Sequence, residues 1–381
     1  MKILLPLIGY ALISSTAFAA NPYQAISGLK YPNEMEEGSE PIATEAWTLP
    51  PGEATYPGYS ELLPYFLRAP NQLSAGSCLY MSLTGIAEFW LSKQHPGLSR
   101  APDGPLDLSE RDLMNIAGLH ENQNGVVDWR TDSAYLFNNA GSIALNSQYR
   151  FTKGWFSVNA NGDYVPAREN APGATYTASY NWIDQRNLAN KSKWVTLPKF
   201  ERQILFADPA HDQWNVGVMP VDIIDRIKTA LTTRHAPVHV IYNHFGYWHA
   251  VIIAGFDDGA DTQNCSFVSR FREWGHSHPA ELRQQAAATT DASRRAALNA
   301  NAAKIEFTSR KFDNAYVAGG GCHPKGMFYV RDSIYSDIGG PIYDYDLSRT
   351  GDEAPYAKTI VLHEYDWIRY MANHATQIYL R

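Results

Sequence analysis

Cysteine is scarce in this sequence, and several familiar sequence elements are missing from it. Only three cysteines occur among 381 residues, at positions 78, 265 and 322. Beyond the first twenty residues no apolar run reaches the roughly 18 residues of a membrane-spanning helix, so we expect no membrane span. There is no glycine-rich phosphate loop and no GxSxG motif, so neither motif supplies a candidate site.

Charge is limited in amount, and its balance is acidic. Charged residues make up 19% of the chain and the formal net charge is −7, which argues against nucleic acid or an anionic membrane as a partner. Hydrophobic residues make up 45% and aromatic residues 13%, a composition that favours a rigid protein with a full core. We expect this protein to be a monomer.

The first twenty residues have the pattern of a secretory signal peptide. A lysine at position 2 is followed by an apolar stretch and then by the sequence AFA at positions 17–19, so we expect cleavage after Ala19 or Ala20. The protein is therefore predicted to be exported, to the periplasm or out of the cell. Residues 21–55 are rich in proline, glycine and acidic residues without a sustained period, and we interpret them as a leader or short prosegment.

The remaining chain, residues 56–381, is predicted to form one α+β domain. Helix signals come first, at 77–94, 106–118 and 133–141, with Ser109 and Gly141 as expected start and stop. Buried strand signals come later, at 237–242, 249–256 and 326–333, and helices followed by strands indicate α+β. An alanine-rich helix or helical pair at 280–304 falls within a predicted insertion at about 258–325.

The cysteines divide into a late pair and one remote residue. An exported protein folds in an oxidising compartment, where an odd count leaves one thiol over. Because Cys265 and Cys322 lie in one late region, we predict a disulfide between them and a free Cys78.

Cys78 is placed where a cysteine becomes reactive. Ser77 is a plausible N-cap, which puts Cys78 in the first turn of a helix, where unpaired N–H groups and the helix dipole favour the thiolate. A nucleophilic thiolate needs an imidazole partner, a group to orient that imidazole, and an oxyanion donor. The alternative is a buried structural thiol.

Four segments, in this order along the chain, resemble the papain family of cysteine peptidases. They are NQLSAGSCLYMSLTGIAEFWL from residue 71, LDLSERDL from residue 106, WHAVIIAGFDDG from residue 248 and MFYVRDS from residue 327. The resemblance covers about residues 60–340. It implies a papain-like two-lobed fold, with a helical half that carries the cysteine, an antiparallel β half that carries the histidine, and the active-site cleft between them.

The resemblance also implies roles for individual residues. Cys78 is the nucleophile, His249 carries the proton, and Asp332 lies at the position of the asparagine that orients the histidine. Gln72 falls where the family keeps its oxyanion glutamine. Gly125, in NQNGVVDW, resembles the glycine along which the substrate backbone pairs.

The sequence departs from the family pattern at several of these sites. Ala75 replaces a cysteine, Leu79 a tryptophan near the nucleophile, and Ile334 the tryptophan that shields the asparagine–histidine hydrogen bond. Asp332 replaces the asparagine, and an aspartate accepts the imidazole N–H equally well. The predicted insertion also lengthens the stretch between His249 and Asp332. We interpret this insertion as a lid or a specificity element.

Each candidate also has a structural interpretation. Cys78 and His249 are then core residues, Asp332 a capping acid, Gln72 a loop polar group and Gly125 a turn glycine.

Competing residues exist for two of the roles. His244 is the alternative histidine, and Asp337 and Asp257 are the alternative orienting acids. The histidines of GHSHP at 275–279 and the one at 323 form no ligand set at metal spacing, so we expect neither metal nor cofactor.

The function expected from the resemblance is an exported cysteine peptidase that acts on protein or peptide substrates. Residues 21–55 are then a short cover over the cleft of a zymogen, or alternatively a strap on the outside of the fold. Two other functions remain open: an acyl transferase of transglutaminase type, and a non-catalytic binding protein that keeps the fold.

Overall fold

The structure is a computed structural model, and it describes part of the chain. The described residues are 58–67, 78–99, 104–114, 116–117, 134, 137–138, 140–148, 156–158, 164–166, 195–207, 222–244, 247–333, 343–344 and 360–381. The predicted signal peptide and the leader at 21–55 lie outside these ranges, as do Gln72 and Gly125.

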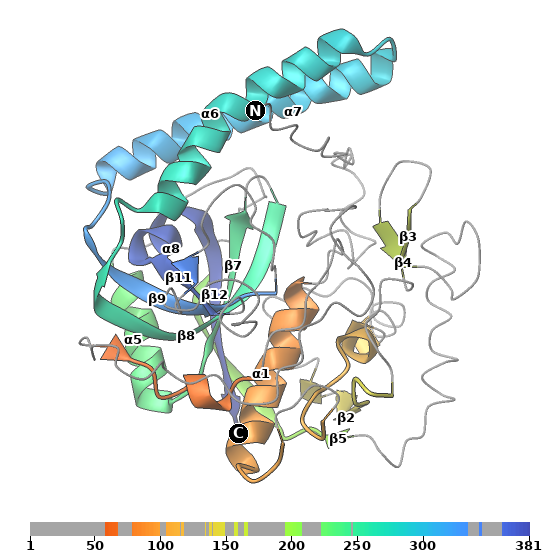
Figure 1. The fold of residues 1–381 in the computed structure, drawn as a ribbon, viewed down its shortest axis with the longest axis vertical. Helices are drawn as coiled ribbons and strands as arrows, with labels where there is room; N and C mark the ends of the chain where they lie inside the picture. Colours follow the sequence, from red (N-terminus) through yellow and green to blue (C-terminus); the bar gives the residue numbers. More distant parts are fainter. Residues whose placement is uncertain are drawn as a thin grey trace.

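An antiparallel sheet forms the centre of the described fold, in the order β10-β11-β9-β8-β7-β12-β6, with β1 added along β8 (Figure 1). Each pairing in it is antiparallel. Its strands are β1 Gly58–Tyr59, β6 Phe200–Ala207, β7 Val238–His244, β8 Tyr247–Asp261, β9 Lys325–Arg331, β10 Tyr343–Asp344, β11 Ile360–Glu364 and β12 Ala372–Leu380. The predicted α+β class is confirmed by this mixture of helices and antiparallel strands.

The central strands form where the sequence is rich in β-branched residues. β7 and β8 pair with Val240 opposite Val251 and with Ile241 opposite Ala250, and these residues are buried. Branched side chains pack well on a pleated surface, which stabilises a sheet covered on both faces. The predicted strands at 237–242, 249–256 and 326–333 are all confirmed.

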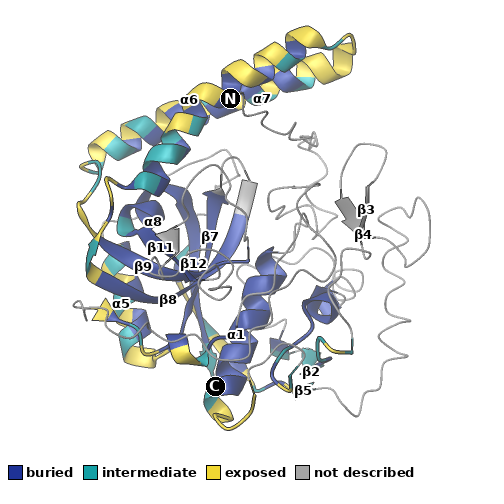
Figure 2. Cartoon of the chain, in the orientation of Figure 1, coloured by how far each residue is buried: buried dark blue, intermediate teal, exposed yellow. Residues whose placement is uncertain are grey.

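Helix α1, Cys78–Gln94, packs against β8 and β12 and is buried from Cys78 to Ser92 (Figure 2). A helix buried on all sides belongs to the interior of a large core, and this one joins the sheet to the smaller helical elements around it. The predicted helix end at Gln94, the start at Ser109 and the stop at Gly141 are all confirmed. The Ser109 hydroxyl accepts from the backbone N–H of Asp112, and Gly141 has a φ of +65°.

Two long helices, α6 (Ser266–Ala288) and α7 (Ala292–Ala318), form an antiparallel hairpin that extends beyond the sheet (Figure 1). A small separate core holds the outer part of the hairpin together, made by Leu282, Ala286, Leu298, Ala302 and Ile305. The predicted helical pair at 280–304 is therefore present, but it is longer at both ends. Pro279 lies inside α6 and does not end it.

The remaining elements are short or peripheral. They are η1 Leu63–Tyr65, β2 Ser142–Ile143, β3 Phe156–Val158, β4 Tyr164–Pro166, β5 Val195–Thr196, α5 Ile223–Arg234 and α8 Tyr365–Met371. Within the described part of the chain, no helix is both long enough and apolar enough to cross a membrane.

Candidate active site

His249 and Asp332 meet at the centre of the sheet. His249 lies on β8, and Asp332 directly follows β9, the strand paired with β8. The His249 Nε2–H donates to the Asp332 carboxylate, with 2.7 Å between Nε2 and Oδ1. The two side chains are only 1% and 5% exposed, so water competes little for this hydrogen bond.

Cys78 is the first residue of α1 and lies near the same imidazole. It is a free cysteine, fully buried, and it lies close enough to His249 to raise the pKa of the imidazole. The structure therefore brings together three of the residues named from the sequence, in the order Cys78, His249, Asp332.

The surroundings of His249 favour its charged form. Burial acts to lower the pKa of this imidazole, but the charge of Asp332, the hydrogen bond to Asp332 and the interaction with Cys78 raise the pKa to about 10. In general, a positive charge beside a cysteine favours the thiolate.

Tyr242 forms one wall of this site, and nothing in the sequence singled it out. It lies directly opposite His249 in the β7–β8 pairing, and the two rings meet edge to face with centroids 5.5 Å apart. Tyr242 is completely buried, and Trp367 packs behind it at 4.9 Å. Burial, together with the charges of Asp332 and Cys78, raises the pKa of Tyr242 well above its usual value.

His363, on β11, is a second histidine beside the site. Its ring packs against Phe267 at 4.3 Å and Trp367 at 4.7 Å, and it lies within electrostatic reach of Asp332 and His249. Burial lowers the pKa of His363 to about 3, so it is neutral at physiological pH. This strand was not predicted individually, because strand and helix signals are mixed over the last thirty residues.

The other sequence candidates divide into two groups. Gln72, Gly125 and Asp337 lie outside the described residues. Asp257 is described, and its carboxylate accepts from the backbone N–H groups of Gly259 and Ala260 at 2.8 and 3.0 Å. The hydrogen bonds of Asp257 therefore belong to an irregular stretch of β8, and the carboxylate bonded to His249 is that of Asp332.

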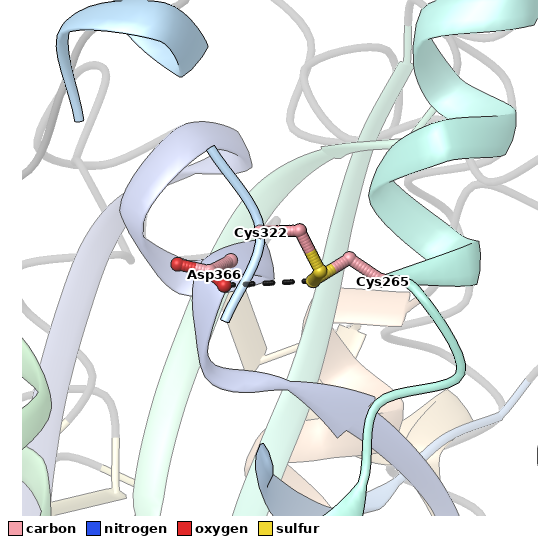
Figure 3. A group of neighbouring side chains, drawn as sticks. All are labelled: Cys265, Cys322 and Asp366. Carbon is pink, nitrogen blue, oxygen red and sulfur yellow. Dashed lines mark hydrogen bonds between the residues drawn. A yellow bond between two sulfur atoms is a disulfide. The ribbon is translucent and has the colours of Figure 1, made fainter. Parts of the chain in front are cut away.

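The two late cysteines form the predicted disulfide. Cys265 precedes α6 and Cys322 follows α7, and their Cα atoms lie 5.8 Å apart. Asp366 lies beside the sulfurs, with its Oδ2 3.5 Å from the Cys265 Sγ (Figure 3). Two cysteines and an acid also make a possible metal group, but sulfurs bonded to each other offer no thiolate ligands, so this set does not fit a metal as it is.

Comparisons with known proteins do not assign a family to this chain. No protein-family model matches the chain, and no curated protein matches it significantly.

Proposed function

We propose that this protein is an exported cysteine peptidase with a papain-like arrangement of its active site. The observation that carries the proposal is the buried His249, which is hydrogen-bonded to Asp332 through Nε2 and lies close enough to Cys78 for the thiol to raise its pKa. A thiol at the start of a helix, an imidazole and an orienting carboxylate are the parts that nucleophilic acyl transfer requires. In this proposal, α1 belongs to one lobe of a papain-like fold and the sheet to the other.

The proposed reaction has two stages. The Cys78 thiolate attacks the peptide carbonyl carbon and forms a tetrahedral oxyanion, for which the Cys78 backbone N–H and Gln72 are the proposed donors. When the C–N bond breaks, the His249 imidazolium gives its proton to the leaving amine, and a thioester remains on Cys78. Water, deprotonated by His249, then attacks the thioester, which releases the acid and restores the Cys78 thiolate beside the His249 imidazolium.

Asp332 has a defined part in this scheme. It holds the imidazole by a 2.7 Å hydrogen bond and favours the imidazolium by its negative charge. Cys78 and His249 thus start as an ion pair, so the sulfur is ready to attack without a separate deprotonation step.

The leader at 21–55 is proposed as a cover over the cleft of the newly exported protein. Sequencing the N-terminus of the active, secreted form tests this proposal. An N-terminus near residue 56 supports it, and an N-terminus at Asn21 in the active form contradicts it.

Two observations favour other functions. The carboxylate at the orienting position suits a transglutaminase-type acyl transferase, which passes the thioester acyl group to an amine instead of water. The complete burial of Cys78 favours a binding protein without catalysis. Comparing amine incorporation with hydrolysis separates the first alternative, and a thiol-directed probe that fails to label Cys78 indicates the second.

The direct test is replacement of Cys78 by alanine or serine. Either variant is expected to lose hydrolysis of denatured casein and labelling by a thiol-directed epoxide. His249→Gln should lose hydrolysis as well, whereas His244→Gln is the matched control and should keep it. Unchanged hydrolysis by Cys78→Ala contradicts the proposal.

A further inference from the structure

Arg331 links the segments that carry the proposed catalytic residues. It is the last residue of β9 and directly precedes Asp332. Only 3% of Arg331 is exposed, although its guanidinium carries a permanent charge. Such a buried charge is tolerated only when hydrogen bonds and nearby polar groups compensate for the lost hydration.

The guanidinium of Arg331 bonds to two other segments. Its Nε donates to the Leu67 carbonyl at 2.9 Å, and its Nη1 lies 3.5 Å from the Met81 carbonyl on α1. Its Nη2 lies 3.5 Å from the carboxylate of Glu88, also on α1. One side chain from the sheet therefore holds the helix that begins with Cys78 and the end of the segment at 58–67.

Gly85 makes the space for this guanidinium. A Cβ at position 85 would lie 2.1 Å from Nη1 and 2.7 Å from Cζ of Arg331, far inside contact distance. A glycine within a helix costs about 1 kcal/mol relative to alanine, and here it lets the arginine cross the helix surface.

Glu88 completes the arrangement on α1. It is 1% exposed, and its Oε1 accepts from the backbone N–H of Leu108 at 3.0 Å. Burial raises the pKa of Glu88 to about 8, although the charge of Arg331 acts in the opposite direction. Glu88 thereby also links the Arg331 guanidinium to the segment at 104–114.

The backbone of Arg331 is fixed as firmly as its side chain. It pairs with Ile252 of β8, three residues beyond His249 in the same strand, and with Ile360 of β11. The side chain thus ties α1 to the strand pair that carries His249 and Asp332. A shift of α1 relative to these strands would change the distance from the Cys78 sulfur to the imidazole.

We propose that Arg331, held by Glu88 in the space left by Gly85, is the positioning residue that sets the contact between Cys78 and the His249–Asp332 pair. This inference rests on the proposed function of the site. A purely structural ion pair would affect the free energy of unfolding but leave the reactivity of the Cys78 thiol unchanged.

The test is the pH dependence of Cys78 alkylation by iodoacetamide in the full chain, since this needs no knowledge of the substrate. In Arg331→Met we expect the apparent thiol pKa to rise by about one unit or more, which is about a tenfold loss of thiolate at low pH. Arg331→Lys keeps the charge but loses the planar fork, so a smaller shift is expected. Gly85→Ala should act like Arg331→Met because it displaces the guanidinium.

Arg369→Met is the matched control. Arg369 is also a buried arginine paired with a carboxylate, that of Asp366 at 3.2 Å, but it lies on α8 beside the disulfide. This variant should be less stable to urea and yet keep the wild-type alkylation profile.

The possible outcomes separate the inference from the proposed function. A folded Arg331→Met with the wild-type alkylation profile overturns the positioning role, while the Cys78–His249 pair still holds. A wild-type thiol that titrates near its ordinary pKa of about 8.5 overturns the proposed function, and the positioning role with it. If Arg331→Met does not fold, the alkylation profiles of Arg331→Lys and Gly85→Ala test the positioning role by the same criterion.

Discussion

At the scale of single residues, the site depends on how charge is shared across one imidazole. His249 is hydrogen-bonded to the Asp332 carboxylate and interacts with the Cys78 thiol, and all three residues are buried. Burial is the largest single effect and lowers the pKa of His249, but the Asp332 charge, the hydrogen bond to Asp332 and the interaction with Cys78 together outweigh it and raise this pKa to about 10. An asparagine at this position would keep the geometry but contribute no charge.

Asp332→Asn separates geometry from charge. Because the Asp332 charge raises the pKa of His249, its removal should lower that pKa and move the alkaline limit of activity to lower pH. We expect hydrolysis to persist at neutral pH, measured as kcat/KM across the pH range. Asp257→Asn is the control and should leave the profile unchanged, and an unaltered alkaline limit in Asp332→Asn would show that its charge is irrelevant.

Tyr242 is expected to matter through its ring. Tyr242→Phe keeps the edge-to-face contact with His249 and the packing on Trp367, so it should retain most activity. Tyr242→Ala removes a fully buried ring, costs about 3 kcal/mol or more in the free energy of unfolding, and admits water to the His249–Asp332 hydrogen bond. Urea denaturation and casein hydrolysis measure the two effects, and equal activity in both variants would contradict a shielding role.

At the scale of elements, the helical hairpin is anchored close to the site. The disulfide joins its two ends, and the Glu364 carboxylate on β11 accepts from the Val268 N–H in the first turn of α6 at 2.7 Å. Phe267, also in this turn, contacts His363. The base of the hairpin therefore belongs to the wall of the site, while the outer part has its own small core.

The disulfide should stabilise the fold without taking part in the chemistry. Cys265 and Cys322 are 57 residues apart, and loop-closure entropy assigns such a bridge about 4 kcal/mol. The double variant Cys265→Ala/Cys322→Ala is expected to lose up to that amount in urea denaturation and to retain labelling at Cys78. Loss of labelling in a variant that is still folded would instead tie the disulfide to the reactive thiol.

At the scale of the whole molecule, buried titratable groups set the pH range of stability. Burial lowers the pKa of His239 and His363 from 6.5 to about 3, so the unfolded chain binds more protons between these values and stability falls as pH decreases through them. Burial raises the pKa of Glu88 from 4.5 to about 8, so its contribution is present at low pH and is lost as pH rises toward 8. His249 loses its contribution between pH 6.5 and about 10.

These opposing effects predict a stability maximum between about pH 4.5 and 6.5, with losses on both sides. Urea denaturation at a series of pH values measures the curve. His239→Gln removes one of the buried imidazoles and should flatten the acid limb, because one proton fewer is taken up on unfolding. A free energy of unfolding that increases steadily from pH 6.5 to 10 would contradict this description.

Much of the candidate site could be predicted from the sequence because its parts have local signatures. Cys78 starts a helix, His249 lies in an apolar strand, and Asp332 follows a strand, and the structure brings these three together. Tyr242 and Arg331 could not be predicted, because their roles depend on strand register and on packing between segments far apart in the chain. The hairpin was underestimated since Pro279 resembles a helix boundary, yet it lies within α6.

The measurement that tests the central claim most directly is an ultraviolet titration of the Cys78 thiolate, taken as the difference between the wild type and Cys78→Ala. The account predicts thiolate absorbance well below the ordinary thiol pKa of about 8.5, and its loss at low pH in His249→Gln. Thiolate that appears only at about 8.5 or above, equally in both proteins, would show that sulfur and imidazole share no proton.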